Sequence, residues 1–330
     1  MADRNDRTAE GGADAAATAG ATLPVSRVQA DGDAVKFCLR TADGHEIESV
    51  IVPMGAEVEG RDQRWRTLCV SSQIGCAREC AFCQTARMGL IRNLTADEIV
   101  AQVDAARQHL GADVRNVVFM GMGEPLDNFE NVVAAITRWH EDRARQIPRR
   151  RVTVSTAGRC AGIRRLAALR WRRLNLAVSL NAPNDEIRSR IMPINRLEPM
   201  AALREAIAAY PVRAGGHVLI EYVMIRGLND AAEHARQLVE YLRGPVEPAS
   251  RRCGHEGPTA PLRTCVNLIP YNPCAGLPYE PSPEEAVVRF QLLLMEAGQM
   301  AFRRNPKGRQ VMAACGQLGN PNGRGRAARG

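Results

Sequence analysis

The sequence lacks any long run of apolar residues. No apolar stretch approaches the ~18 residues that a membrane-spanning helix needs, and the first residues lack the basic-then-apolar order of a secretory signal. No internal repeat is present beyond an alternation of strand-like and helical segments. These absences argue against a membrane protein and favour a cytoplasmic location.

A second pair of closely spaced cysteines is also missing. Structural zinc motifs usually combine two CxxC-like units, and no clean second unit is present. Disulfide scaffolds belong to short secreted chains, whereas this chain has 10 cysteines in 330 residues. The set Cys253, His255, Cys265 and Cys274 matches no familiar zinc spacing. Reactive thiols in a reducing compartment therefore fit the cysteine content better than a disulfide framework.

Lysine is scarce, and arginine supplies almost all of the positive charge. The net charge is +8 and the pI is about 9.2, with arginines clustered at 149–151, 164–165, 170–173, 251–252 and 303–304. Such clusters favour binding of a polyanion such as a nucleic acid. The alternative is that genomic base composition has replaced lysine by arginine throughout.

Three cysteines, Cys76, Cys80 and Cys83, lie within eight residues and form the most informative feature of the chain. A loop this short can turn three thiolates onto one inorganic core. A cubane iron–sulfur cluster usually has four cysteinyl ligands, so three would leave one iron open to bind a substrate. The alternatives are a zinc site or chance clustering.

Composition and pattern divide the chain into four parts. Residues 1–27 are small and polar and are predicted to be a disordered leader, so that the fold begins near Val28. Residues 28–66 form a β-hairpin extension, with alternating strands at 34–39 and 47–52. A larger unit covers 67–318 and carries a surface insertion at 243–264, and 319–330 form a basic, flexible tail.

Six strand-like segments alternate with helical ones from Leu68 onward. They lie near 68–70, 116–120, 151–154, 174–178, 218–223 and 265–269, with helices near 129–145, 199–209, 231–242 and 283–297. Thr95 and Glu98 form a capping box ahead of a further helix. This order predicts an α/β fold in which six βα units build a parallel sheet or partial barrel.

In βα barrels, chemistry gathers where strands end. Polar residues follow four of the predicted strands, and we expect them to converge on the cysteine loop. They are Gly121-Met-Gly-Glu-Pro, Ser155-Thr-Ala-Gly, Ser179-Leu-Asn and Asn272.

The cysteine spacing resembles the CxxxCxxC signature of radical S-adenosylmethionine (radical SAM) enzymes, with Phe82 at the usual aromatic position. The remaining motifs look like those of the RlmN/Cfr family of RNA adenine methyltransferases, over about residues 46–318. They are Cys69-Val-Ser-Ser-Gln-Ile-Gly-Cys76, Gly121-Met-Gly-Glu-Pro-Leu, Ser179-Leu-Asn-Ala-Pro-Asn-Asp, Asn267-Leu-Ile-Pro-Tyr-Asn-Pro and Ala313-Ala-Cys315-Gly-Gln-Leu.

This resemblance implies methylation of an adenine carbon in ribosomal or transfer RNA, on a partial (βα)6 barrel of the radical SAM type. The implied cofactors are a [4Fe-4S] cluster on Cys76, Cys80 and Cys83 and two molecules of S-adenosylmethionine per turnover. The resemblance further implies that Cys315 is first methylated, that its S-methyl group is converted to a radical that adds to adenine, and that Cys69 releases the product by forming a disulfide with Cys315.

The resemblance also implies contacts and partners. Glu48 matches the proton acceptor of the family, although the chain is longer than usual between Glu48 and Cys69. A reductant such as flavodoxin or ferredoxin and a monomeric state are implied as well. The residues implied to contact the cofactor are Gly123, Glu124, Ser155, Ser179, Leu180, Asn181 and Asn272, with Asn181 where many family members have histidine.

The chain departs from the family in two places. Ahead of the hairpin it has only a short polar leader, where RlmN-like proteins carry a helical accessory domain, and Asn305-Pro-Lys-Gly-Arg-Gln replaces the usual Arg-Gly-Asp-Asp-like stretch before Cys315. The run Gln84-Thr-Ala-Arg-Met-Gly and the pair Glu124-Pro125 favour RlmN-like methylation at C2 over Cfr-like methylation at C8. An activase that generates a protein radical and a non-catalytic RNA-binding protein are the remaining alternatives.

Overall fold

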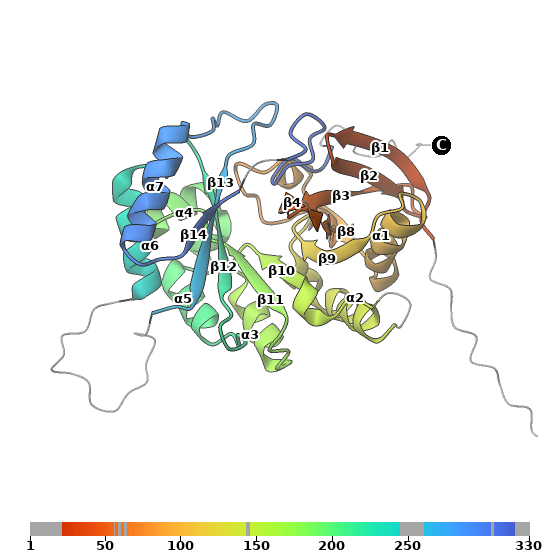
Figure 1. Cartoon of the computed structure of the whole chain (residues 1–330), viewed down its shortest axis with the longest axis horizontal. Coiled ribbons are helices and arrows are strands. Elements are labelled where there is room, and N and C mark those ends of the chain that lie inside the picture. Colours follow the sequence, from red (N-terminus) through yellow and green to blue (C-terminus); the bar gives the residue numbers. More distant parts are fainter. Residues whose placement is uncertain are drawn as a thin grey trace, which may run out of the picture.

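A single curved sheet of ten strands organises the molecule, with its helices along the outer side (Figure 1). The strand order is β1-β2-β3-β6-β9-β10-β11-β12-β13-β14. The computed structural model describes residues 22–55, 57–58, 61–62, 65–142, 146–244, 261–304 and 307–320. The predicted α/β class with a mostly parallel sheet is confirmed.

Seven neighbouring strands of this sheet are parallel. Six of them are the predicted ones, and the seventh, β14, was not predicted because it has only three residues. Their bounds are β6 Trp65–Cys69, β9 Val114–Phe119, β10 Val152–Thr156, β11 Asn175–Ser179, β12 Val218–Met224, β13 Thr264–Pro270 and β14 Ala301–Arg303.

Helices connect the parallel strands. Two of them, α3 and α4, were missed by the sequence analysis. The α-helices are α1 Ala96–Gln108, α2 Phe129–Glu141, α3 Cys160–Ala168, α4 Asp185–Ile191, α5 Met200–Ala208, α6 Ala232–Arg243 and α7 Glu284–Glu296. The 3-10 helices are η1 Thr85–Met88, η2 Pro125–Asn128, η3 Arg149–Arg151 and η4 Pro193–Arg196.

The N-terminal extension has three antiparallel strands, one more than the predicted hairpin. They are β1 Val25–Asp31, β2 Ala34–Arg40 and β3 Glu46–Met54, and β3 pairs with β6. β1 begins before the predicted start near Val28; it is an edge strand with little burial, so its sequence has no apolar alternation. Between β3 and β6, the short strands β4 Glu57–Val58 and β5 Arg61–Asp62 account for the extra length after Glu48.

Three predicted segments lie wholly or largely outside the described residues. They are the leader before residue 22, the central part of the insertion at 243–264, and the tail after residue 320. No helix in the ranges that the structure describes is long and apolar enough to cross a membrane.

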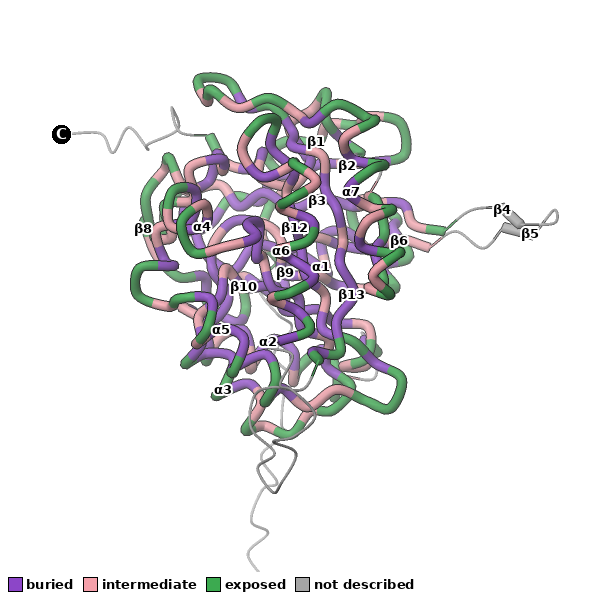
Figure 2. Tube along the Cα trace, turned by 90° about the vertical axis from the view of Figure 1, so that its left-hand side faces the viewer, coloured by how far each residue is buried: buried purple, intermediate pink, exposed green. Residues whose placement is uncertain are grey.

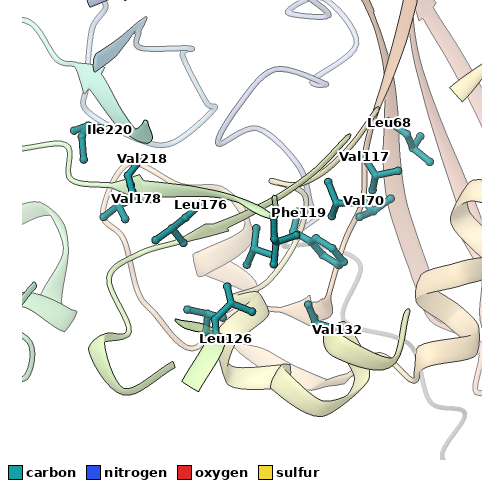
Figure 3. Packing of buried hydrophobic residues seen from close by; sticks show 14 of the residues in the cluster. Leu68, Val70, Val117, Phe119, Leu126, Val132, Leu176, Val178, Val218 and Ile220 are labelled. Carbon is teal, nitrogen blue, oxygen red and sulfur yellow. The ribbon is translucent and has the colours of Figure 1, made fainter. Parts of the chain in front are cut away.

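The core lies between the sheet and the helices, where side chains alternate between two faces. Val117 and Phe119 of β9, and Leu176 and Val178 of β11, are buried on the face that meets the helices (Figure 3). Phe119 packs on Trp139 of α2, with ring centroids 5.7 Å apart. Burial is continuous through the centre of the molecule (Figure 2). The opposite face of each strand is therefore free to carry polar side chains.

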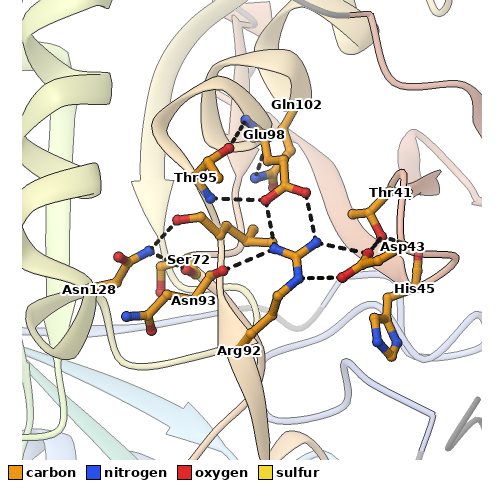
Figure 4. Close-up of polar contacts among 11 residues, drawn as sticks. Thr41, Asp43, His45, Ser72, Arg92, Asn93, Thr95, Glu98, Gln102 and Asn128 are labelled. Carbon is orange, nitrogen blue, oxygen red and sulfur yellow. Dashed lines mark hydrogen bonds and ion pairs between the residues drawn. The ribbon is translucent and has the colours of Figure 1, made fainter.

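A polar network secures the strands that flank the cysteine loop, β7 Gln73–Gly75 and β8 Leu90–Asn93. Arg92 of β8 donates two hydrogen bonds of 2.8 Å to the carboxylate of Glu98 and contacts Asp43 between β2 and β3 (Figure 4). Glu98 also completes the predicted capping box with Thr95, which is confirmed. Arg92 thus ties the N-terminal extension to the start of α1.

The carboxylates in this network lower the stability at acid pH when they are protonated. Hydrogen bonds from Arg92 hold the pKa of Asp43 below its usual value. Burial opposes the shift at Glu98, but its hydrogen bonds to Arg92 and Thr95 still lower its pKa. Because both folded pKa values are lowered, their contribution is present above the unfolded values, about 4, and is lost as the pH falls through the folded values.

We predict that Arg92→Leu lowers the free energy of unfolding of the iron-free protein by about 1–2 kcal/mol at pH 7. The expected loss is this small because Asp43 is partly exposed, so that solvent screens its interaction with Arg92. Urea unfolding at pH 7 and pH 3 measures this difference, which should shrink at pH 3. The control is Arg236→Leu, which breaks an exposed pair with Glu233 and should change stability little. An equal loss for Arg92→Leu at both pH values would contradict the role given to the carboxylates.

Candidate active site

The loop between β7 and β8 carries Cys76, Cys80 and Cys83. The N–H of Cys76 donates to the Gly89 carbonyl at 2.9 Å, which closes the loop at its base. Gly75 is required there, since its φ is +76° and a Cβ atom would lie 1.8 Å from the Gly89 oxygen. All three cysteines line one cavity of about 160 Å³ at the carboxyl ends of the strands, as expected.

The three thiols have the chemistry of an iron–sulfur site. Burial raises the pKa of Cys76 to about 12 and also raises those of Cys80 and Cys83, and the other thiols add to the effect at Cys80. Ligation by iron would offset this cost, because thiolate is the ligand form. Among the described residues, no group of three or more His, Cys, Asp or Glu side chains is arranged to hold a metal ion. Each cysteine of a cubane binds a different iron, so a cluster would not require the three thiols to meet at one ion.

Gly123 and Glu124 follow β9 and lie beside the cysteines in this cavity. The φ of Gly123 is +99°, and a Cβ atom there would lie 2.5 Å from Cβ of Gln73, so the backbone approach needs glycine. The carboxylate of Glu124 accepts from the N–H groups of Ala157 at 2.7 Å and Leu126 at 3.0 Å. Burial nevertheless raises the pKa of Glu124 to about 7, and a cationic group bound beside it would favour its charged form.

Four other predicted cofactor contacts separate into two groups. Ser155 and Ser179 line the cysteine cavity. Asn181 lines it too, but its Oδ1 accepts from the N–H of Val223 at 2.9 Å, so part of its amide has a structural role. The side chain of Leu180 is fully buried in the core and is not among the lining residues.

Asn272 lies in a second cavity, of about 500 Å³, which adjoins the first. Its Nδ2 donates to the Cys315 carbonyl at 3.2 Å, and its Oδ1 accepts from Arg309 at 2.8 Å. Asn272 therefore holds the C-terminal segment in place. The resemblance had implied instead that this side chain contacts the cofactor.

Cys315 lies at the junction of the two cavities and lines both of them. Its segment is bound to the cysteine loop by hydrogen bonds from Gln84 N–H to the Gly316 carbonyl, at 2.8 Å, and from Thr85 Oγ1 to the Leu318 carbonyl, at 2.6 Å. These contacts join residues more than 200 positions apart in the sequence. They place Cys315 next to the three-cysteine cavity.

Cys69, at the end of β6, lines the larger cavity together with Cys315. Both are free thiols. Burial raises the pKa of Cys69 to about 12, and the nearby Cys315 adds to the rise, whereas the charge of Arg304 lowers it. The structure thus brings together the two thiols that the sequence analysis paired.

Glu48 does not line either cavity. It is buried on β3, where its carboxylate accepts from the Gly319 N–H at 3.0 Å and lies 3.5 Å from the ammonium of Lys36. The C-terminal segment covers it in this arrangement.

The sequence analysis missed several residues of the site. Glu221 of β12 and Asn267 of β13 point to the inner face, and Arg304 interacts electrostatically with both thiols. The fully buried Arg188 donates to the Leu180 and Ala157 carbonyls and so braces two strand-end loops. A signal for Glu221 existed: it is a lone charged residue at an inner position of the apolar run Val218-Leu-Ile-Glu-Tyr-Val-Met.

Comparisons with known proteins agree with this geometry. Residues 70–239 match the model of the radical SAM superfamily. The chain is 41% identical to the dual-specificity RNA methyltransferase RlmN of Desulfotalea psychrophila, over 89% of this chain and 76% of that protein. It is 43% identical to RlmN of Phenylobacterium zucineum, over 86% and 69%. The crystal structure of a radical SAM methyltransferase from Sphaerobacter thermophilus superposes with a TM-score of 0.78 at 39% identity, covering 90% of this chain and 81% of that one.

We predict that alanine at Cys76, Cys80 or Cys83 reduces iron and sulfide to background after anaerobic reconstitution, whereas the wild type binds about four irons per chain. Metal and sulfide analysis measures this. Cys160→Ala is the control, since Cys160 is a buried free thiol that packs in the core at the start of α3. Stoichiometric zinc in the wild type, or iron retained in the variants, would contradict the assignment.

Proposed function

The chain belongs to the RlmN family of the radical SAM superfamily, and from this membership we propose that it methylates C2 of an adenosine in ribosomal or transfer RNA, with Cys315 carrying the methyl group. The observation that carries the proposal is the pair of free thiols, Cys69 and Cys315, in one cavity that adjoins the three-cysteine cavity. Neither a protein-radical activase nor a non-catalytic RNA-binding protein needs such a pair.

The residues that would hold the cofactors lie in the smaller cavity. Cys76, Cys80 and Cys83 would ligate the cluster, and Glu124, which lines the same cavity, would accept a hydrogen bond from the ammonium group of S-adenosylmethionine. When bound, these groups supply methyl groups and the one-electron chemistry that activates a C–H bond, with two molecules of S-adenosylmethionine used per turnover.

Cys315 can serve both cavities because it lies between them. A thiolate at this position accepts a methyl group from the cofactor side and presents it, as a thioether, toward the larger cavity. The positive charge of Arg304 interacts with Cys315, and this interaction raises the pKa of Arg304.

Cys69 is placed to release the product. Its attack on the sulfur of Cys315 forms an S–S bond and breaks the bond between that sulfur and the methylene carbon on adenine. The carbon keeps the electron pair and takes up a proton to become the methyl group. The disulfide then needs two electrons from an external reductant, for which flavodoxin, ferredoxin or a thiol is suitable.

Glu48 is proposed as the acceptor of the ring proton, on condition that the C-terminal segment moves. Its carboxylate is engaged by Gly319 and Lys36, so the C-terminal segment has to move before Glu48 reaches an adenine in the cavity.

RNA would enter through the larger cavity, which two of the arginine clusters approach. Arg150 and Arg151 line it from one side, and Arg303, Arg304 and Lys307 line it from the other. Burial, together with the charges of Arg115 and Arg150, lowers the pKa of Arg151, whereas the charge of Asp113 opposes this shift. Phosphate groups would relieve this repulsion and offset the few kcal/mol needed to unstack the target base.

C2 is favoured over C8 by the loop that touches the methyl carrier. Gln84, whose N–H binds the Gly316 carbonyl, begins the run that is closer to the RlmN pattern.

We predict that RNA with deuterium at adenine C2 loses it at the methylated residue, whereas deuterium at C8 stays. Mass spectrometry of digested nucleosides measures both labels. Loss from C8 alone would establish the Cfr-like alternative, and cofactor cleavage with no RNA methylation would favour an activase.

The two thiols should fail in different ways. We predict that Cys315→Ala abolishes methylation, whereas Cys69→Ala accumulates a covalent protein–RNA adduct because no thiol is available to release Cys315. Denaturing gels with labelled RNA detect the adduct. Cys160→Ala should turn over like the wild type. Methylation undiminished in Cys315→Ala would overturn the mechanism.

A further inference from the structure

The inner face of β12 holds a carboxylate that the mechanism does not use. Glu221 is 4% exposed and lines both cavities. Its Oε2 accepts from Asn267 Nδ2 at 2.8 Å, but its Oε1 has no hydrogen-bond partner among the described residues. An unpaired buried acceptor is costly, so its retention indicates a partner that is absent from the free protein.

The backbone fixes the position of this carboxylate. The Glu221 carbonyl accepts from the N–H groups of Leu180, at 3.0 Å, and Asn181, at 3.3 Å, and Glu221 pairs in register with Ser179 and Asn267. A small shift of the strand therefore cannot bring a hydrogen-bond donor to the free oxygen. Rotation of the Glu221 side chain can present this oxygen to a donor in the cavity.

Arg304 supplies a donor group in the same cavity. In the part of the chain that the structure describes, the hydrogen bond found for its guanidinium is a long one of 4.0 Å to Met120 Sδ. Its charge acts on Glu221, but the two side chains form no ion pair within 4.0 Å in the described structure. The space between them thus offers an acceptor and a donor, which suits a neutral ligand with both kinds of group better than a lone anion or cation.

We propose that Glu221 is the specificity residue for the target base: its free carboxylate oxygen accepts a hydrogen bond from the exocyclic amino group of adenine. This inference rests on the proposed function. Guanine presents a carbonyl oxygen at that position, which the carboxylate repels. Arg304, on the side of Cys315, is then available to donate to a ring nitrogen.

The test compares a stem–loop RNA that the wild type methylates with the same stem–loop carrying purine riboside, which lacks the amino group, at the target position. The wild type should have a kcat/KM roughly tenfold lower on purine riboside, the effect of one charge-assisted hydrogen bond. Glu221→Leu should lose about the same factor on adenosine and should no longer distinguish the two RNAs. Glu221→Gln, which retains an acceptor, should recover part of the discrimination.

Thr153→Val is the matched control, since Thr153 lines the same cavity from β10; it should keep the wild-type ratio between the two RNAs. Iron content and the KM for S-adenosylmethionine are measured for every variant. Undiminished discrimination in Glu221→Leu, or a loss confined to S-adenosylmethionine binding, would overturn the inference. If Glu221→Leu does not fold, Glu221→Ala takes its place, and undiminished discrimination between the two RNAs in that variant overturns the inference. If the wild type methylates no RNA, the proposed function itself has failed.

Discussion

The alternation of side chains across a curved, mostly parallel sheet is the constraint on which the rest of this structure depends. On one face, residues such as Phe119 and Val178 bury apolar surface against the helices, which supplies the main driving force for folding. On the other face, residues of the same strands, such as Ser179 and Glu221, line the cavities. One residue of register shift would exchange the two faces, so the packing of the core also places the polar groups of the site.

The C-terminal segment completes the site from outside the sheet. Its hydrogen bonds to Gln84, Thr85 and Asn272 hold Cys315 between the two cavities. Most of these bonds use backbone carbonyls, so they set the path of the segment with little demand on its side chains. This explains how the segment can depart from the usual family sequence at 305–310 and still present its thiol. The same segment binds Glu48 through the Gly319 N–H, so access to that carboxylate requires the segment to move.

The site gathers groups that disfavour folding, and other parts of the molecule offset them. The buried carboxylates of Glu124 and Glu221 and the clustered arginines at the cavity are each costly in the free protein. The apolar core and the network around Arg92 lie on the outer side of the sheet or at its edge. This separation lets the inner face serve ligands without loss of the fold.

Much of the chain was predictable from local pattern, because apolar periodicity and capping chemistry act over a few residues. The six parallel strands, the capping box at Thr95 and the cysteine loop follow from such patterns, and the motifs around Cys69 and Cys315 identified the family. Tertiary structure alone decided the rest. In the structure, β1 belongs to the N-terminal extension and the side chain of Leu180 lies in the core. Asn272 binds the C-terminal segment, and Glu221 and Arg304 line the same cavity. These outcomes depend on which strands become neighbours and on hydrogen bonds between residues far apart in sequence, and neither leaves a signal in a short window of residues.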